Sequence, residues 1–122
     1  MKYLYKDLTY RIIGAAMEVH KELGPGFLES VYEEAFIVEL KRLNIPFEQQ
    51  QKYYVNYKGV DIKEYYCDLV IDGKVIIELK AIKQIGDIER AQILNYLKVT
   101  KLRLGLLMNF GSESLEYERI IK

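Results

Sequence analysis

The sequence predicts an α/β protein in which helices flank a central mixed sheet, and three observations support this fold class. Residues 8–23 and 28–43 carry apolar side chains at helical spacing. Residues 66–80 contain two runs of bulky and β-branched residues around Asp72-Gly73, which is typical of two strands joined by a tight turn. A further helical pattern opens at Gly86-Asp87 and leads into an apolar run at 102–109, as expected for a crossover between parallel strands.

The first two predicted helices are separated by a short link. The first begins near Asp7 or Thr9 and ends at Gly24-Pro25, because glycine accepts a left-handed cap and proline cannot continue a helix. The second ends before Pro46. Its expected buried face consists of Leu28, Val31, Tyr32, Ala35, Phe36 and Leu43.

Three strands are expected next, at 47–57, 63–71 and 75–82, and they predict an antiparallel meander. Asp87 is the expected N-cap of the third helix. The apolar side of that helix is expected to comprise Ile88, Ala91, Leu94 and Leu97. Strands at 102–109 and 115–121 complete the predicted order.

Composition narrows the class of protein. At 122 residues the chain is long enough for a core of its own, and we expect one domain over residues 1–122. A net charge of zero argues mildly against a dedicated nucleic-acid coat protein, and a single cysteine, Cys67, excludes an internal disulfide and a cysteine-based zinc site. No apolar run approaches the roughly 18–20 residues of a membrane span, and the first residues lack a secretory signal core. We therefore expect a cytoplasmic protein with no membrane partner.

Charged residues interrupt the apolar strand pair at Asp68, Glu78 and Lys80. Charges inside a buried strand are costly unless they pair or bind a metal, so these three are the first candidates for a functional site. Glu78 and Lys80 are two apart and point to one face of a strand. A two-residue loop at Asp72-Gly73 would place Asp68 on the opposite face, whereas a three-residue loop places all three charges together. The turn residues allow both, and we predict the three-residue loop on this chemical ground.

The spacing of these charges resembles that of a known family. Asp68 followed by the tripeptide Glu78-Leu79-Lys80 resembles the D…(D/E)xK signature of the PD-(D/E)XK nuclease superfamily. The segment 26–32, with Gly26, Glu29 and Tyr32 in the motif positions, is similar to the motif that names the GxxExxY proteins, a branch of that superfamily. The resemblance extends from about residue 8 to the C-terminus. It implies a restriction-endonuclease-like αβββαβ core with an extra N-terminal helix and an extra C-terminal strand.

The resemblance also implies metal-dependent hydrolysis of phosphodiester bonds in DNA, with RNA as the second choice. Asp68 and Glu78 would be the primary ligands of Mg²⁺ or Mn²⁺, which are hard cations that prefer oxygen, and the Leu79 carbonyl would be a third ligand. Lys80 would position or help deprotonate the attacking water. In related nucleases a glutamate on the first core helix reaches the metal site, and Glu29 holds the matching position.

Two further residues follow on the predicted third helix. Gln92 and Tyr96 are four apart and therefore neighbours on one helix face. They resemble the QxxxY element of the exonuclease-like branch, which implies that Gln92 orients the water or a phosphate oxygen and that Tyr96 contacts substrate. Tyr32 is the second substrate contact that we expect from the resemblance. A solvated glutamine beside a half-buried tyrosine is the structural alternative for the helix pair.

Two other functions compete with the nuclease hypothesis. The chain can be a binding or accessory module for nucleic acid or protein on a nuclease-like fold, which the neutral net charge favours. Alternatively, Asp68, Glu78 and Lys80 can form a cross-strand ion-pair network with a purely structural role. A homodimer is a further expectation, because many nucleases of this fold pair to address two strands.

Overall fold

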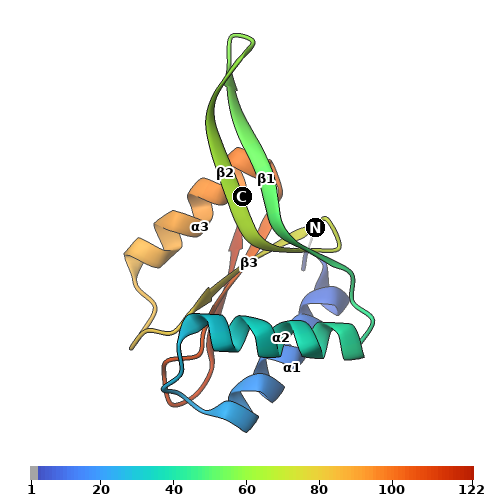
Figure 1. Ribbon diagram of the computed structural model, residues 1–122, viewed down its shortest axis with the longest axis vertical. Helices are drawn as coiled ribbons and strands as arrows, with labels where there is room; N and C mark the ends of the chain where they lie inside the picture. The colour runs from blue at the N-terminus through green and yellow to red at the C-terminus, as the bar shows by residue number, and fades with distance from the viewer. Residues whose placement is uncertain (1–2) are drawn as a thin grey trace. The chain divides into compact units, whose positions relative to one another are not determined.

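The computed structural model describes residues 3–122 of the chain. Over that range it contains three helices and five strands (Figure 1): α1 (Lys6–Leu23), α2 (Glu29–Arg42), β1 (Phe47–Tyr57), β2 (Val60–Ile71), β3 (Val75–Lys80), α3 (Asp87–Thr100), β4 (Leu104–Asn109) and β5 (Glu116–Ile121). The strands form one mixed sheet in the order β1-β2-β3-β4-β5, in which β1, β2 and β3 are an antiparallel meander. The predicted α/β class is confirmed, and the run from α2 to β4 is the predicted αβββαβ core.

The chain divides into two compact units. The first comprises the chain up to Pro46 together with Leu79–Ile85 and Met108–Glu118. Within it α1 and α2 pack together, because each presents an apolar stripe at helical spacing. The buried apolar side chains of the two helices are Ile12, Ala15, Ala16 and Val19 from α1 and Tyr32, Phe36, Ile37 and Leu40 from α2. Gly24 ends α1 at a φ of 67° and donates its N–H to the carbonyl of His20, as the predicted glycine cap requires.

The second unit comprises Phe47–Glu78, Gly86–Leu107 and Arg119–Lys122. The β1–β2 hairpin turns at Lys58-Gly59, where both residues have positive φ. β3 pairs with the Leu69–Ile71 end of β2, so the other end of the hairpin projects as a two-stranded ribbon (Figure 1). Helix α3 packs on β1 and β2. The core of this unit consists of Cys67, Val70, Ile76 and Leu97, with Tyr53, Tyr96, Leu102 and Ile120 packed against it.

The starts of two helices differ from the predictions. Neither Asp7 nor Thr9 caps α1, because the residue before the helix is Tyr5, which has a φ of 53° and no side-chain cap. Asp87 is the first residue of α3 rather than its N-cap, and that position belongs to Gly86. In both cases the backbone conformation before the helix, which the sequence pattern does not encode, sets the first residue.

Two helices bury only part of the expected face, because Tyr32 and Phe36 of α2 and Leu97 of α3 are buried as predicted while other expected residues are not. In α2 the buried stripe is Tyr32, Phe36, Ile37 and Leu40, whereas these residues of the expected face are exposed: Leu28, Val31 and Leu43. In α3 the buried residues are Ile93 and Leu97, whereas these are exposed: Ile88, Ala91 and Leu94. The apolar residues of each helix spread over more than one face, and tertiary packing selects which of them are buried.

Strand ends shift by two or three residues, as in β2, which begins at Val60, and β3, which ends at Lys80. None of the helices in the described part of the chain has the length and apolar character needed to cross a bilayer.

Candidate active site

The register between β2 and β3 brings two of the candidate carboxylates face to face. Ile71 pairs with Val75 and Leu69 pairs with Ile77, so a three-residue loop joins the strands, as predicted. Within that loop Asp72 and Gly73 have φ values of 53° and 63°, in the left-handed region. Continuing the register by one pair places Asp68 opposite Glu78. A two-residue loop would instead have set Asp68 against an isoleucine.

These charged residues alternate with buried apolar neighbours. Asp68 is exposed and lies between the buried Cys67 and Leu69, and Glu78 is half-buried. Lys80, two residues further along β3, is also half-buried and points to the same side of the strand as Glu78. The charged groups therefore reach solvent while the strands on which they lie remain anchored in the core.

Gln50 of β1 is a neighbour of Asp68 that the sequence analysis did not identify. Its Nε2 atom donates a hydrogen bond of 3.1 Å to Oδ1 of Asp68. Gln50 has a φ of 53°, unusual inside a strand, and lies between the pairs that Gln49 and Gln51 make with β2. The sequence did contain a signal for this contact. A run of glutamines at 49–51 lies in a strand that was expected to pair with the strand of Asp68.

The charges of both carboxylates act on the hydroxyl of Tyr96 of α3. Burial, followed by the negative charge of Glu78 and smaller effects that include Asp68, raises the pKa of the Tyr96 hydroxyl. Burial and the same two carboxylates raise the pKa of the Cys67 thiol to about 12. The Tyr96 hydroxyl therefore keeps its proton at neutral pH and can donate a hydrogen bond. Cys67 is a neutral core residue and has no nucleophilic role.

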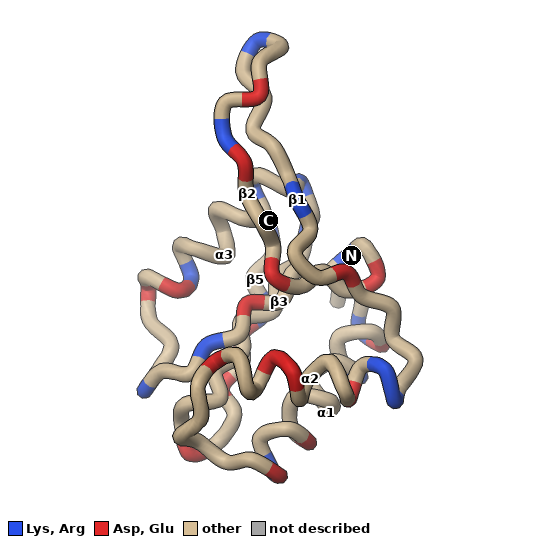
Figure 2. Tube along the Cα trace, viewed as in Figure 1, with Lys and Arg blue, Asp and Glu red and all other residues tan. Residues whose placement is uncertain are grey.

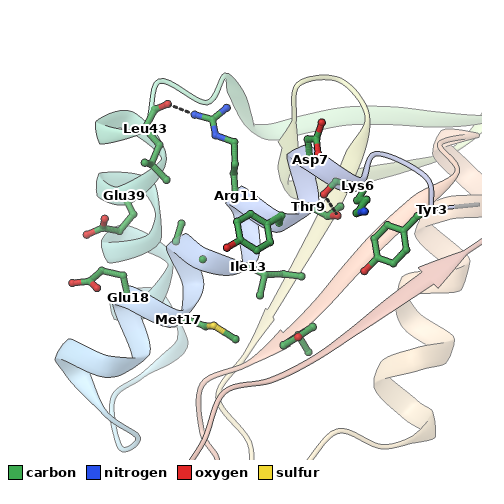
Figure 3. A pocket seen from close by; sticks show the side chains of 14 residues that line it. Tyr3, Lys6, Asp7, Thr9, Arg11, Ile13, Met17, Glu18, Glu39 and Leu43 are labelled. Atoms are coloured by element: carbon green, nitrogen blue, oxygen red, sulfur yellow. Dashed lines mark hydrogen bonds between the residues drawn. The ribbon is translucent and has the colours of Figure 1, made fainter.

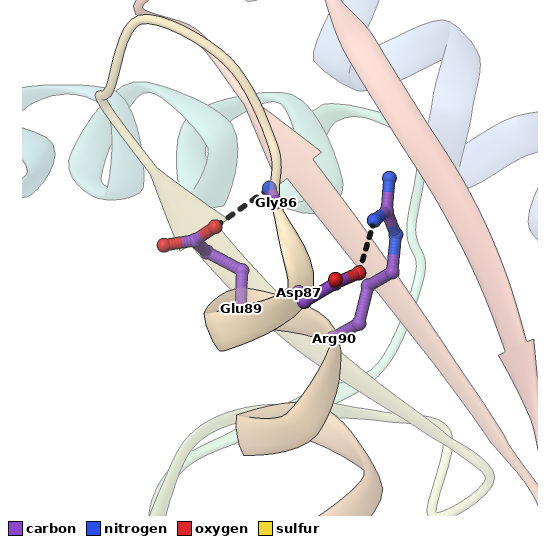
Figure 4. Close-up of polar contacts among 4 residues, drawn as sticks. All are labelled: Gly86, Asp87, Glu89 and Arg90. Atoms are coloured by element: carbon purple, nitrogen blue, oxygen red, sulfur yellow. Dashed lines mark hydrogen bonds and ion pairs between the residues drawn. The ribbon is translucent and has the colours of Figure 1, made fainter.

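The position of Tyr96 is fixed by contacts along α3. Its ring meets the Tyr65 ring edge-on, with centroids 5.8 Å apart, and Asn95 donates to the Tyr65 hydroxyl at 3.3 Å. Gln92 lies one turn earlier and is exposed. The carboxylate of Glu89 accepts the N–H of Gly86 at 2.7 Å and so fixes the start of the helix (Figure 4).

The backbone after Lys80 is held by a buried asparagine that the sequence analysis missed. Asn109, at the end of β4, is fully buried, and its Nδ2 donates to the Ile82 carbonyl at 3.0 Å and to Glu116 at 2.8 Å. Its Oδ1 accepts the N–H groups of Ile82 and Gly111 at 2.9 and 3.0 Å. The next residue of the chain, Phe110, donates its N–H to the Lys80 carbonyl at 2.8 Å. In the sequence, the signal for this residue was a single amide side chain, Asn109, inside the apolar run 104–110.

In the first unit, the motif residues Glu29 and Tyr32 have different environments. Glu29 is the first residue of α2 and is exposed, while Glu33, one turn later, is half-buried. Tyr32 is fully buried, and its hydroxyl donates to the Gly24 carbonyl at 2.5 Å and accepts the Phe27 N–H at 3.1 Å. These contacts tie the link between α1 and α2 to the helix and give Tyr32 a structural role. The substrate contact that the resemblance implies for Tyr32 stays a prediction.

The oxygen donors of the strand pair fit a hard divalent cation that keeps much of its water. Across residues 3–122, no group of three or more His, Cys, Asp or Glu side chains lies close enough to hold a metal. Asp68 and Glu78 offer two carboxylates, and the backbone between Glu78 and Lys80 offers the Leu79 carbonyl. Mg²⁺ is commonly bound by one or two carboxylates together with water and substrate phosphate, so this donor set suits it.

Comparison with known proteins shows a match to a family model, a likeness to solved structures and one negative result. A family model described as the PD-(D/E)XK nuclease superfamily matches residues 6–120. The crystal structure of a protein named SSO0001 is similar at a TM-score of 0.51 and 15% sequence identity, a likeness that concerns the fold alone. That match covers 88% of this chain but spans 61% of the other. None of the curated proteins compared with the chain matches it.

Proposed function

Because this chain belongs to the PD-(D/E)XK nuclease superfamily, we propose that it is a metal-dependent nuclease that hydrolyses phosphodiester bonds in DNA, with RNA as the second choice. The observation that carries the proposal is the β2–β3 register, which sets Asp68 opposite Glu78, with Lys80 two residues further along the same strand. A structural ion-pair network alone would not require two carboxylates opposite each other, since like charges in that position are destabilising.

Each residue of the site has a chemical task in this proposal. Asp68, Glu78 and the Leu79 carbonyl would hold Mg²⁺ or Mn²⁺, which neutralises phosphate charge and makes bound water acidic. Lys80 places an ammonium where it can orient the attacking water and balance the charge that develops on the phosphate oxygens. Water would form the new bond to phosphorus and lose a proton to solvent, and the leaving sugar oxygen would take a proton from solvent as its bond to phosphorus breaks. Gln92 orients the water or a phosphate oxygen in this scheme.

The hairpin supports nucleic acid as the partner. Tyr54 and Tyr66 are exposed on it, and the ammonium of Lys52 lies 6.0 and 5.6 Å from the centres of their rings. Tyr57, near the turn, has Lys58 at 5.4 Å. Charges of both signs follow one another along the ribbon (Figure 2), so simple attraction to a polyanion is weak there. Stacking of bases on exposed tyrosines, assisted by neighbouring ammonium groups, suits this composition.

A non-catalytic binding module is the second candidate. It is favoured by the lack of a three-carboxylate group within residues 3–122 and by the neutral net charge. The same hairpin would serve it, since stacking and phosphate contacts do not need a metal. It differs from the nuclease in one measurable respect, namely binding of nucleic acid without turnover. The metal-site role of Glu29 and the GxxExxY assignment stay predictions under either function.

The test combines Mn²⁺ calorimetry with cleavage of labelled single-stranded and duplex DNA. We expect saturable Mn²⁺ binding and metal-dependent cleavage by the unaltered protein, and loss of both in Glu78→Gln. Glu22→Gln is the matched control, because Glu22 is an exposed carboxylate of α1 and belongs to neither strand of the β2–β3 pair. Lys80→Met should abolish cleavage and leave Mn²⁺ binding nearly unchanged, with Lys74→Met in the turn as its control.

The outcomes separate the two candidates. Cleavage that survives in Glu78→Gln and Lys80→Met would refute the assigned site. DNA binding without cleavage under any divalent metal would favour the binding module. Stability that falls in Glu78→Gln, with no metal binding by the unaltered protein, would favour the structural ion-pair network.

A further inference from the structure

One face of α1 is exposed along its whole length. Residues 7, 10, 11, 14, 17, 18 and 21 are all exposed and recur at the spacing of a single helical stripe. The opposite stripe is the one that packs in the first unit. Helix α1 therefore presents a second continuous surface that its own unit does not cover.

Large apolar side chains lie on this exposed face. Tyr10 is 80% exposed and Met17 is 48% exposed, and they are seven residues apart, two turns along the same stripe. The face borders a hollow of about 860 Å³, which is also lined by Leu43 and Tyr117. Figure 3 shows Arg11, Ile13 and Met17 along α1 at this hollow, with Glu39 of α2 and Leu43, which follows that helix, beside it.

The centre of the face is Gly14, which lies midway between Tyr10 and Glu18. A Cβ added to Gly14 would meet nothing within 4 Å, so the monomer has no packing reason for glycine there. Glycine inside a helix costs roughly 1 kcal/mol relative to alanine. The absence of a side chain at this point does allow another helix backbone to approach closely.

We propose that this face of α1 is a homodimer interface, in which α1 of one copy packs antiparallel against α1 of a second copy around a two-fold axis beside Gly14. A two-fold axis of this kind is the commonest symmetry of protein dimers and requires a surface complementary to itself. In such a pair, a residue some distance before Gly14 in one copy lies level with the residue equally far after Gly14 in its partner. The proposal concerns association alone and does not depend on nuclease activity.

The charges on the face are complementary in this arrangement. Asp7 lies seven residues before Gly14 and Lys21 seven residues after it, so each aspartate meets a lysine of the other copy. Arg11 and Glu18 lie on the same flank of the stripe, three before and four after the glycine, so each arginine lies within one residue of being level with a glutamate of the other copy. The two-fold axis doubles both ion pairs, whereas a parallel pair of helices would set like charges against like.

The apolar residues are complementary as well. Tyr10 and Met17 lie on the other flank, four before and three after Gly14, so the ring of each copy packs on the methionine of the other. Arg11 is already oriented, because its guanidinium donates to the Leu43 carbonyl at the end of α2 (Figure 3). A guanidinium has five donors, so this bond leaves others for a carboxylate.

Sedimentation equilibrium over a range of concentrations tests the interface. We expect the unaltered protein to form dimers, and Asp7→Lys and Lys21→Asp each to raise the dimer dissociation constant by at least about tenfold through like-charge contacts. The double variant Asp7→Lys/Lys21→Asp should recover dimerisation, since it exchanges the partners of each pair. Gly14→Arg should fold at least as well as the unaltered protein and remain monomeric. Glu34→Lys, on the exposed side of α2, is the control and should dimerise normally.

Two results would overturn the proposal. An unaltered protein that stays monomeric at every concentration would show that the face does not pair with itself. Dimers that persist in Gly14→Arg and in both single charge variants would show that the copies associate through another surface. Circular dichroism of each variant checks that it is folded, so loss of the dimer cannot be attributed to loss of α1.

Discussion

Replacing the motif tyrosine by phenylalanine tests whether Tyr32 holds the fold together or contacts substrate. The substitution keeps the buried ring, which stacks on Phe110 at a centroid distance of 4.8 Å, and removes only the hydroxyl. That hydroxyl donates to the Gly24 carbonyl and accepts the Phe27 N–H. Each hydrogen bond contributes roughly 0.5–1.5 kcal/mol net, so Tyr32→Phe should lower the free energy of unfolding by about 2 kcal/mol.

Urea denaturation and a thermal scan measure this loss. At about 4 °C per kcal/mol for a domain of this size, the melting temperature should fall by roughly 8 °C. Tyr57→Phe is the control, since Tyr57 is exposed near the hairpin turn and should unfold like the unaltered protein. A Tyr32→Phe protein of unchanged stability, but with a raised KM for DNA, would refute the structural role and favour substrate contact.

Three further predictions address backbone packing, thiol reactivity and helix capping. Gly111→Ala should destabilise the fold by at least about 3 kcal/mol in urea denaturation, because its Cβ would lie 2.2 Å from the backbone oxygen of Ile82. The Cys67 thiol, with its pKa raised to about 12, should be alkylated slowly at a pH near the ordinary thiol pKa of about 8.5 and rapidly once urea unfolds the chain; equal rates would contradict the burial argument. Glu89→Ala should cost about 0.5–2 kcal/mol of stability by removing the acceptor at the start of α3, whereas Asp87→Asn should cost less.

The strand pair could be predicted from sequence because two constraints agreed. Apolar runs around Asp72-Gly73 identified the hairpin, but these turn residues are compatible with loops of either length. The cost of scattering charges over both faces of a buried strand selected the three-residue loop, and the observed pairing of Ile71 with Val75 confirms it. The chemistry of the proposed ligands thus predicted a backbone detail that turn propensity left open.

The faces of α2 and α3 could not be predicted in the same way. The expected apolar residues of α3, Ile88, Ala91, Leu94 and Leu97, recur every three residues, whereas Ile93 and Leu97 are four apart. Both intervals are compatible with a helix, so periodicity alone does not select between them, and only Ile93 and Leu97 are buried. The close fit of Ile93 against Gly105, where an added Cβ would lie 2.6 Å from its Cδ1 atom, is a contact between α3 and β4. No local pattern encodes such a long-range contact.

Polar residues inside buried strands have two different meanings in this protein. Asn109 is fully buried, and hydrogen bonds to Ile82, Gly111 and Glu116 satisfy its amide. Glu78 and Lys80 interrupt their strand in the same way but stay half-buried, so their charged ends can reach solvent. A polar residue that interrupts an apolar strand is therefore not by itself a candidate for the functional site. The exposure of its side chain to solvent separates the structural residues from the candidates. By this criterion Asn109 holds the backbone that follows Lys80, whereas Asp68, Glu78 and Lys80 are the groups that we propose act on a phosphodiester.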